Sequence, residues 1–176
     1  MGFIKTVLFG GGGTTSRTGD FMLAVVRLSL ATFMVVGHGW GKLYQTTDAG
    51  THLGPSQGFV DGVASMGFPV PLLSTWLAVL AETLFAALLG LGLFTRLAAF
   101  VLVFNMGVAA FVAHGGDPWF MSGAGASKEP AMLYLLPFML FLVIGAGNLS
   151  LDAFIRGKRT LPPAAPSTPR TEAAKC

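Results

Sequence analysis

The chain has 176 residues, of which 53% are hydrophobic and 11% are charged, and its formal net charge is +3. A mean hydropathy of +0.69 is outside the usual range of a soluble domain and indicates an integral membrane protein. The single cysteine, Cys176, excludes an intramolecular disulfide, a Cys-x-x-Cys redox pair and a thiolate metal cluster within one chain. Any redox role would therefore need a bound cofactor or a partner protein.

Four nearly uncharged runs predict membrane-spanning helices: residues 21–37, 72–94, 97–113 and 131–145, the last with an extension to residue 149. Because an α-helix rises about 1.5 Å per residue, about 17 to 23 residues cross a hydrocarbon core about 30 Å thick. We therefore predict an all-α fold, an integral membrane four-helix bundle over residues 20–152. It would lie between a cytoplasmic N-terminal segment, 1–19, and a disordered, basic cytoplasmic tail, 153–176.

Helix-start signals precede these runs. We expect Asp20 to cap the first helix and Thr95 to cap the third, because both side chains accept hydrogen bonds from free N–H groups. Pro71 is expected to open the second helix, and Ser127 stands just before the first turn of the fourth. The four signals divide the chain at the same places as the apolar runs.

The distribution of Lys and Arg predicts the orientation. With both termini on one side, that side carries Lys5, Arg17, Arg96, Arg156, Lys158, Arg159, Arg170 and Lys175, and the other side carries Lys42 and Lys128. The positive-inside rule then places both termini in the cytoplasm. The tryptophans and tyrosines fall at the outer helix ends, where an interfacial aromatic belt accounts for them without any binding site. The basic tail follows from this topology, and we expect no nucleic-acid partner.

Two ionisable residues fall inside the predicted spans. Arg27 lies in the first and Glu82 in the second, and counting residues from the start of each run puts both near the middle of the bilayer. A charge there is costly, so we expect the two side chains to form an ion pair inside the bundle. Two interpretations stay open: the pair joins two helices structurally, or Glu82 is a proton or ligand site in a cavity.

The segment VVGHGWGKLYQ ends the first apolar run with a cluster of polar and small residues. His38 and Lys42 are four apart and would share a helix face, which the neighbouring glycines leave open to a ligand or helix. His114 ends the third run at the same outer level. A quinone headgroup or small acid could bind to His38 and Lys42. Interfacial anchoring is the alternative, and a haem or metal site is disfavoured because no third ligand has suitable spacing.

The combined pattern resembles the DoxX family of small bacterial four-helix membrane proteins. The resemblance covers about residues 27–152 and rests on the His-Gly-x-x-Lys-Leu turn at 38–43, Gly-x-Pro at 67–69, Glu82, Gly-Leu-x-Thr-Arg-Leu-Ala at 92–98 and Gly-x-Gly-x-x-Ser-Leu-Asp at 145–152. It implies a multi-pass protein of the bacterial inner membrane. Some members of the family work in membrane redox systems, including the small subunit of thiosulfate:quinone oxidoreductase and membrane anchors of oxidoreductase assemblies.

Three functions are compatible with these observations. In the first, the chain is a quinone-linked redox subunit in which Arg27, His38, Lys42 and Glu82 line one outward pocket, with other subunits of a membrane complex as partners. In the second it is a non-catalytic scaffold or accessory subunit. In the third it is a small-solute carrier, which the absence of a broken-helix repeat disfavours. The sequence contains no self-contained catalytic motif.

Overall fold

The computed structural model describes residues 16–47, 50–123 and 125–157. Helix α2 (Arg17–Met34) continues through a π-helical turn, η1 (Val35–Gly39), into α3 (Trp40–Leu43). Its cap is Ser16, whose hydroxyl accepts a hydrogen bond from the Gly19 amide at 2.9 Å. The expectation that Asp20 caps this helix is therefore wrong. Asp20 lies within the first turn, is buried, and accepts a hydrogen bond from the Asn148 side-chain amide at 2.7 Å.

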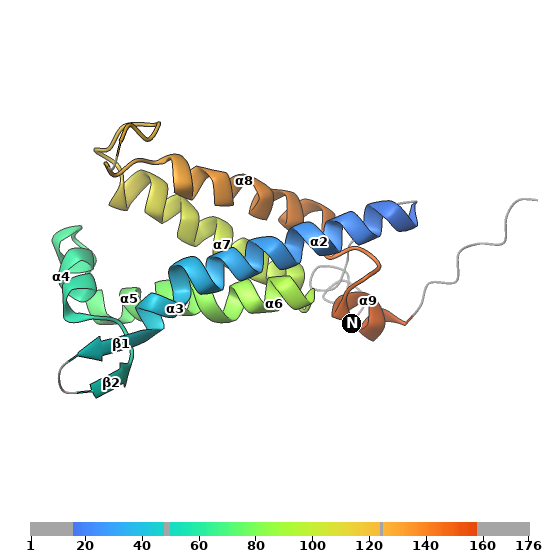
Figure 1. Ribbon diagram of the computed structural model, residues 1–176, viewed down its shortest axis with the longest axis horizontal. Helices are drawn as coiled ribbons and strands as arrows, with labels where there is room; N and C mark the ends of the chain where they lie inside the picture. The colour runs from blue at the N-terminus through green and yellow to red at the C-terminus, as the bar shows by residue number, and fades with distance from the viewer. Residues whose placement is uncertain (1–15, 48–49, 124, 158–176) are drawn as a thin grey trace, which may run out of the picture.

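A short β-hairpin follows the first helical segment. Strands β1 (Tyr44–Thr47) and β2 (Gly50–Leu53) pair antiparallel with Tyr44 opposite Leu53. The predicted all-α fold did not include this hairpin, which forms because the polar segment beyond the helix end satisfies its backbone groups by local pairing. Helix α4 (Gln57–Ser65) comes next and lies crosswise to the long helices (Figure 1). We call this end, which carries β1, β2 and α4, the hairpin end.

The second and third long segments are each a helix with a π-helical turn. The second consists of α5 (Pro71–Leu80), η2 (Ala81–Phe85) and α6 (Ala86–Leu91), and Pro71 opens it as predicted. The third consists of α7 (Thr95–Val108) and η3 (Ala109–Ala113). Thr95 is not its cap: Asp152 accepts hydrogen bonds from the amides of Phe94 and Thr95 at 2.8 and 2.9 Å. A distant carboxylate therefore does the capping that the sequence suggested for a local hydroxyl.

The last elements are α8 (Glu129–Ile144), which contains Pro137, and the short helix α9 (Leu151–Arg156). Helix α9 extends the ordered chain four residues beyond the predicted bundle, whereas the rest of the predicted tail lies outside the described residues. So does most of the predicted N-terminal segment. Both ends of the described chain, the start of α2 and helix α9, lie at the end opposite the hairpin (Figure 1), which we call the terminal end.

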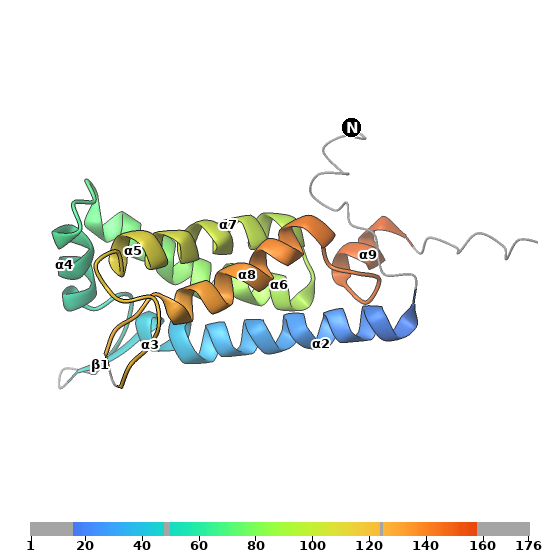
Figure 2. The same ribbon diagram turned by 90° about the horizontal axis from the view of Figure 1, so that it is seen from above.

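Three helical segments of the described chain are long and apolar enough to cross a membrane: Arg17–Leu43, Pro71–Leu91 and Thr95–Ala113. Helix α8 is strongly apolar but has 16 residues. Helix α2 packs along α6, α6 along α7, and α7 along α8 (Figure 2). The core between them contains Met34, Leu89, Leu102, Phe138 and Phe141.

Small residues set how closely the helices approach one another. In a membrane, moving apolar side chains from lipid to a helix interface gains little free energy, so close packing determines which helices associate. A Cβ on Gly90 would lie 2.7 Å from the Cβ of Ala31, so the backbone of α6 packs directly against the small Ala31 side chain of α2 there. A Cβ on Gly39 would lie 2.7 Å from the carbonyl oxygen of Glu82, which brings η1 against η2. A Cβ added to Gly37 or Gly41 would meet nothing within 4 Å. Of the three glycines near His38, only Gly39 therefore allows a close helix contact.

Candidate functional site

Arg27 lies at the terminal end and is bound by backbone carbonyl groups. Its Nε donates to the carbonyl of Gly90 at 3.0 Å, and one Nη donates to that of Leu149 at 2.9 Å. The other Nη donates to the carbonyl of Ala146. The side chain is buried. Arg27 therefore joins three parts of the chain: α2, the end of α6 and the segment that follows α8.

The predicted ion pair between Arg27 and Glu82 is wrong. Helix α2 begins at Arg17, so it projects beyond the turn between α6 and α7 at the terminal end (Figure 1). Arg27 consequently reaches the level of Gly90 and Gly92. Glu82 lies eight residues before Gly90 on the same helical segment, which is a rise of about 12 Å toward the hairpin end. Counting from the first apolar residue put the two charges at one level because it ignored the polar start of α2.

Glu82 instead forms an ion pair with Lys42. The ammonium nitrogen of Lys42 lies 2.6 and 2.8 Å from the two carboxylate oxygens of Glu82. The Asn105 side-chain amide on α7 also donates to Glu82, at 3.3 Å. The ring of Phe59 on α4 lies 5.1 Å from the Lys42 nitrogen, which adds a cation–π contact. The Glu82 side chain is 6% exposed and that of Lys42 is 33% exposed, so Lys42 closes the site toward the hairpin end.

Two π-helical turns place this ion pair. Glu82 lies in η2, and η1 ends at Gly39, three residues before Lys42. Gly39 allows η1 to contact the backbone of Glu82 directly, which brings the following turn, α3, within reach of the carboxylate. Single π-helical turns widen a helix locally and often occur at functional sites. The ion pair is therefore built by the closest approach between the first and second helical segments.

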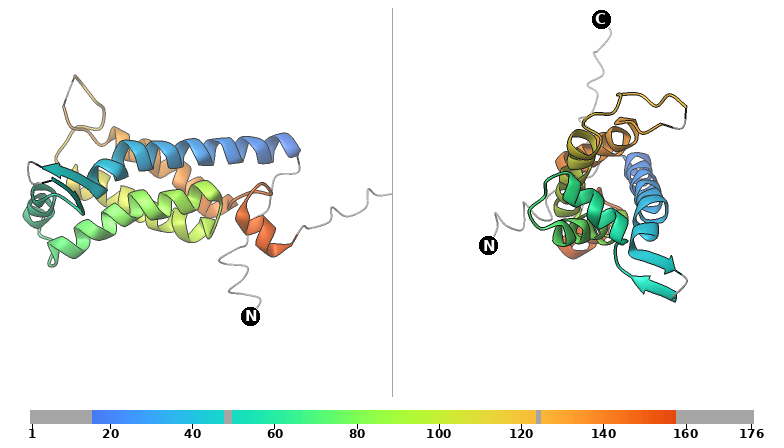
Figure 3. Two further views of the ribbon diagram at one scale, coloured as in Figure 1. Left: turned by 60° about the horizontal axis from the view of Figure 1, so that its bottom comes forward. Right: turned by 90° about the vertical axis from the view of Figure 1, so that its left-hand side faces the viewer.

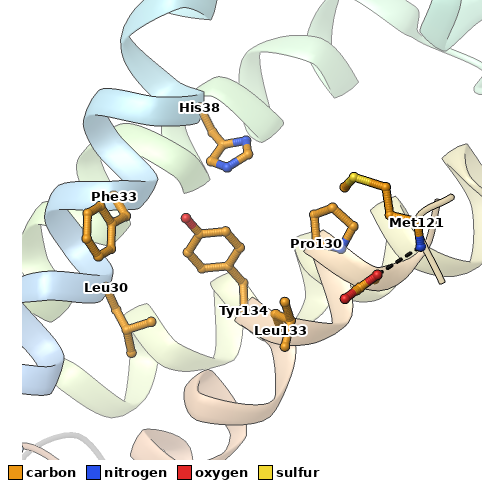
Figure 4. Close-up of a pocket in the computed structure, with 8 residues that line it drawn as sticks. Leu30, Phe33, His38, Met121, Pro130, Leu133 and Tyr134 are labelled. Atoms are coloured by element: carbon orange, nitrogen blue, oxygen red, sulfur yellow. Dashed lines mark hydrogen bonds between the residues drawn. The ribbon is translucent and has the colours of Figure 1, made fainter. Parts of the chain in front are cut away.

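His38 faces a different neighbour from Lys42. Its ring contacts that of Tyr134 on α8 edge to face, with the centroids 5.3 Å apart. The wide turn at η1 changes the rotation per residue, so the expected shared face of His38 and Lys42 does not form. Figure 4 shows the two rings side by side, with the Tyr134 hydroxyl pointing toward α2. Among the described residues, no hydrogen-bond partner is found for the His38 ring nitrogens or this hydroxyl.

A pocket of about 450 Å³ opens beside His38 in the seam between α2 and α8 (Figure 4). Its lining consists of Leu30, Phe33, His38, Met121, Glu129, Pro130, Leu133 and Tyr134. The Glu129 carboxylate is already bound by the Met121 amide at 2.8 Å. The walls are thus mainly apolar, and His38 and Tyr134 offer polar groups to a ligand. The prediction that Arg27, Lys42 and Glu82 line one pocket with His38 is wrong, since none of these three contributes to the lining.

His114 belongs to the loop between α7 and α8 at the hairpin end. Its Nδ1 lies 2.8 Å from a carboxylate oxygen of Asp117. Lys128 donates to the carbonyl groups of Gly115 and Asp117 and lies 5.2 Å from the centre of the Trp119 ring. The structure therefore gathers Asp117, Trp119 and Lys128 near His114, where their contacts hold the loop together. Within the described residues, no group of three or more His, Cys, Asp and Glu side chains is arranged to bind a metal ion.

Sequence reasoning missed two polar residues of these sites. Tyr134 was counted only as part of an aromatic belt, although its position one helical turn inside the fourth run distinguishes it from a residue at the very end of a helix. Asn105 is an amide within an otherwise apolar run, and a polar side chain inside a span is itself a signal. The sequence alone does not identify His38 as the neighbour of Tyr134 or Glu82 as the partner of Asn105, because the two members of each pair lie on different helical segments.

The comparisons with known proteins agree with this architecture. The family model described as DoxX matches residues 22–115, which is more than half of the chain. The chain belongs to the DoxX family. An uncharacterized protein of Haemophilus influenzae is 34% identical over 135 residues, covering 75% of this chain and 89% of the relative. The inner membrane protein YphA of Escherichia coli is 34% identical over 103 residues, covering 54% and 70%. No solved structure matches the chain.

Family membership and the three span-forming segments establish where this DoxX protein resides. It is a multi-pass protein of the bacterial cytoplasmic membrane. The segments Arg17–Leu43 and Pro71–Leu91, which carry His38, Lys42 and Glu82, are two of the three that are long and apolar enough to cross this membrane.

Proposed function

We propose that this protein is an integral membrane subunit of a redox-linked assembly and binds a quinone in the pocket between α2 and α8. The observation that carries the proposal is the pairing of His38 and Tyr134 in the lining of a mainly apolar pocket. A quinone ring has two carbonyl oxygens that accept hydrogen bonds and an apolar tail that prefers lipid. A histidine N–H and a tyrosine O–H are suitable donors to the carbonyl oxygens, and the open seam between α2 and α8 has room for the apolar tail.

The residues around the pocket support this assignment. Leu30 and Phe33 on α2 and Leu133 on α8 provide apolar surface that a ring can pack against. An imidazole has two ring nitrogens, so His38 can donate a hydrogen bond to a carbonyl oxygen through one of them and interact with a second polar group through the other. Bound quinone would supply the redox chemistry, and a partner protein would supply the electrons, because the only cysteine of this chain is Cys176.

Quinone binding can be tested with protein purified in mild detergent. We expect solvent extraction to release a quinone from the wild-type protein and a short-tailed quinone analogue to quench its tryptophan fluorescence. His38→Ala and Tyr134→Phe should each weaken binding of the analogue at least tenfold, since each removes one donor. The matched control is His114→Ala, which removes a histidine outside the pocket. Equal affinity in all four proteins, or no binding by the wild type, would contradict the proposal.

A scaffold function without a bound ligand is the second candidate. It is favoured by the exposed apolar side chains of Trp119, Phe120 and Met121 in the loop between α7 and α8, which suit a protein contact at the hairpin end. Replacing Phe120 with Ser should then release a partner that co-purifies with the wild-type protein while quinone binding is unchanged. Loss of quinone binding together with the partner would favour the first function instead.

We further propose that α8 is the fourth span and that both termini face the cytoplasm. Helix α8 is about 24 Å long, which a bilayer about 30 Å thick accommodates by local thinning or through its flanking residues. The excess of Lys and Arg at the terminal end supports this orientation. In a Cys176→Ser background, a membrane-impermeant maleimide added to intact spheroplasts should label Phe120→Cys and spare Arg156→Cys. The reverse pattern would invert the topology, and labelling of both would remove the fourth span.

A further inference from the structure

Helix α9 is amphipathic and turns its apolar side outward. Phe154 is 81% exposed, Ile155 56% and Leu151 41%, whereas Asp152 is 2% exposed. Figure 3 shows α9 beside the terminal end of the long helices, outside the core that they enclose. Three large apolar side chains side by side at an exposed surface are unusual unless something apolar covers them.

The apolar side of α9 is fixed in this direction. Asp152 accepts hydrogen bonds from the amides of Phe94 and Thr95, and its own amide donates to the carbonyl of Gly92 at 2.8 Å. Arg27 donates a hydrogen bond to the carbonyl of Leu149, two residues before the start of α9. Turning Phe154 and Ile155 inward would require breaking these bonds at the start of α7. The helix therefore cannot bury its apolar residues by rotating against the bundle.

The charges around α9 are basic. The described acidic residues at the terminal end, Asp20 and Asp152, are both buried and engaged in hydrogen bonds. Arg17 and Arg156 are exposed at this end, and the sequence continues with Lys158 and Arg159. A positive surface next to exposed aromatic and aliphatic side chains is complementary to the interface of an anionic bilayer, where phosphate groups lie beside acyl chains.

We infer that α9 is an interfacial helix that binds anionic phospholipid at the terminal end of the bundle. Leu151, Phe154 and Ile155 enter the boundary between headgroups and acyl chains, and Arg17 and Arg156 contact lipid phosphates. Because α9 caps α7 through Asp152, lipid that holds α9 in place also supports the junction of α7, α6 and α2. This inference concerns the opposite end from the quinone pocket and does not depend on it.

The insertion of α9 can be measured with a fluorophore. In a Cys176→Ser background, Phe154→Cys is labelled with an environment-sensitive dye, and the protein is placed in nanodiscs of phosphatidylcholine with or without one third phosphatidylglycerol. We expect blue-shifted emission, quenching by lipids spin-labelled near the headgroup, and at least twofold less quenching by iodide than at Gly58→Cys on the exposed side of α4. Ile155→Cys provides a second position. Iodide access equal to that of Gly58→Cys at both positions would overturn the inference.

The preference for anionic lipid has its own test. Replacing Arg17 and Arg156 with Gln should reduce the phosphatidylglycerol that co-purifies with the protein at least twofold, whereas Lys128→Gln at the hairpin end should leave it unchanged. Equal retention in the two variants would contradict the lipid assignment. Inorganic phosphate should displace no more phosphatidylglycerol than chloride at equal ionic strength. Specific displacement by phosphate would instead indicate a site for the free ion and would also overturn the inference.

Discussion

Arg27 and Glu82, two of the buried charged residues of this bundle, are held by different kinds of partner. Arg27, at the terminal end, is held by three backbone carbonyl groups from α6 and the segment after α8. Glu82, nearer the hairpin end, is held by the side chains of Lys42 and Asn105. The partners of Arg27 are fixed in the backbone, whereas the main partner of Glu82 is a flexible side chain that is one third exposed.

This difference indicates which site can change during function. Moving Arg27 would leave three carbonyl groups without this donor, two of them in a buried position, so the terminal end behaves as a rigid joint. The ammonium group of Lys42 can leave Glu82 and extend toward water at the hairpin end, because its long aliphatic chain permits it. We therefore expect substitutions at Arg27 to change stability most and substitutions around Glu82 to separate stability from function.

The largest effect is expected for Arg27→Met. The variant keeps much of the volume of the side chain but removes every hydrogen bond to the carbonyls of Gly90, Ala146 and Leu149. We expect the free energy of unfolding to fall by about 3–4 kcal/mol, since hydrogen bonds to charged groups are among the strongest in proteins. Reversible unfolding in mixed detergent and SDS micelles measures it. Arg17→Met, at an exposed position, is the control and should change stability by less than about 0.5 kcal/mol.

A smaller but asymmetric effect is expected at the ion pair. Lys42→Met leaves Glu82 buried with Asn105 alone and should destabilise the protein by about 2 kcal/mol, whereas Glu82→Gln leaves a lysine that can reach water and should cost about 1 kcal/mol or less. In the double variant, Glu82→Gln should recover most of the stability lost with Lys42→Met. The same micelle titration gives the coupling energy of this cycle. Additive losses, or a greater cost for Glu82→Gln, would show that the pair does not behave as described.

The contact between η1 and η2 can be tested by adding one methyl group. Gly39→Ala would place a Cβ 2.7 Å from the Glu82 carbonyl oxygen and 2.6 Å from the Thr83 methyl group, so the two segments must separate. We expect a loss of about 1–2 kcal/mol, typical of overpacking a close contact. Gly37→Ala is the matched control, because its Cβ would meet nothing within 4 Å. Equal stability of both variants would mean that the close approach is not needed to place Lys42.

The smallest effect is expected for Asn105→Leu. The amide of Asn105 donates to Glu82 at 3.3 Å, a long bond that supplements the two short ones from Lys42. We expect a loss of less than about 1 kcal/mol in the wild-type background. In the Lys42→Met background Asn105 is the main remaining partner, so the same substitution should cost more there. A thermal-shift series in one detergent compares the four proteins, and identical costs in both backgrounds would contradict this role of Asn105.

Several features of the fold follow from local sequence. The apolar runs identify the long helical segments, and Pro71 marks the start of the second, because hydropathy and a missing N–H act within a single turn or run. The Gly-Leu-x-Thr-Arg-Leu-Ala and Gly-x-Gly-x-x-Ser-Leu-Asp motifs locate the terminal end. The sequence did not reveal that they meet there, with Asp152 capping α7 across 57 residues of chain.

The partners of the buried charges were decided by tertiary structure. Arg27, Lys42 and Glu82 are recognisable in the sequence as costly groups that need partners, since each lies in or next to an apolar run. Which partner each one meets depends on helix levels and rotations. The start of α2 at Arg17 moves Arg27 toward the turn between α6 and α7, and the wide turn at η1 directs His38 to Tyr134 and Lys42 to Glu82. A shift of one helical turn, about 5.4 Å, exceeds the length of a hydrogen bond, so composition and spacing determine the helices while only their packing determines the sites.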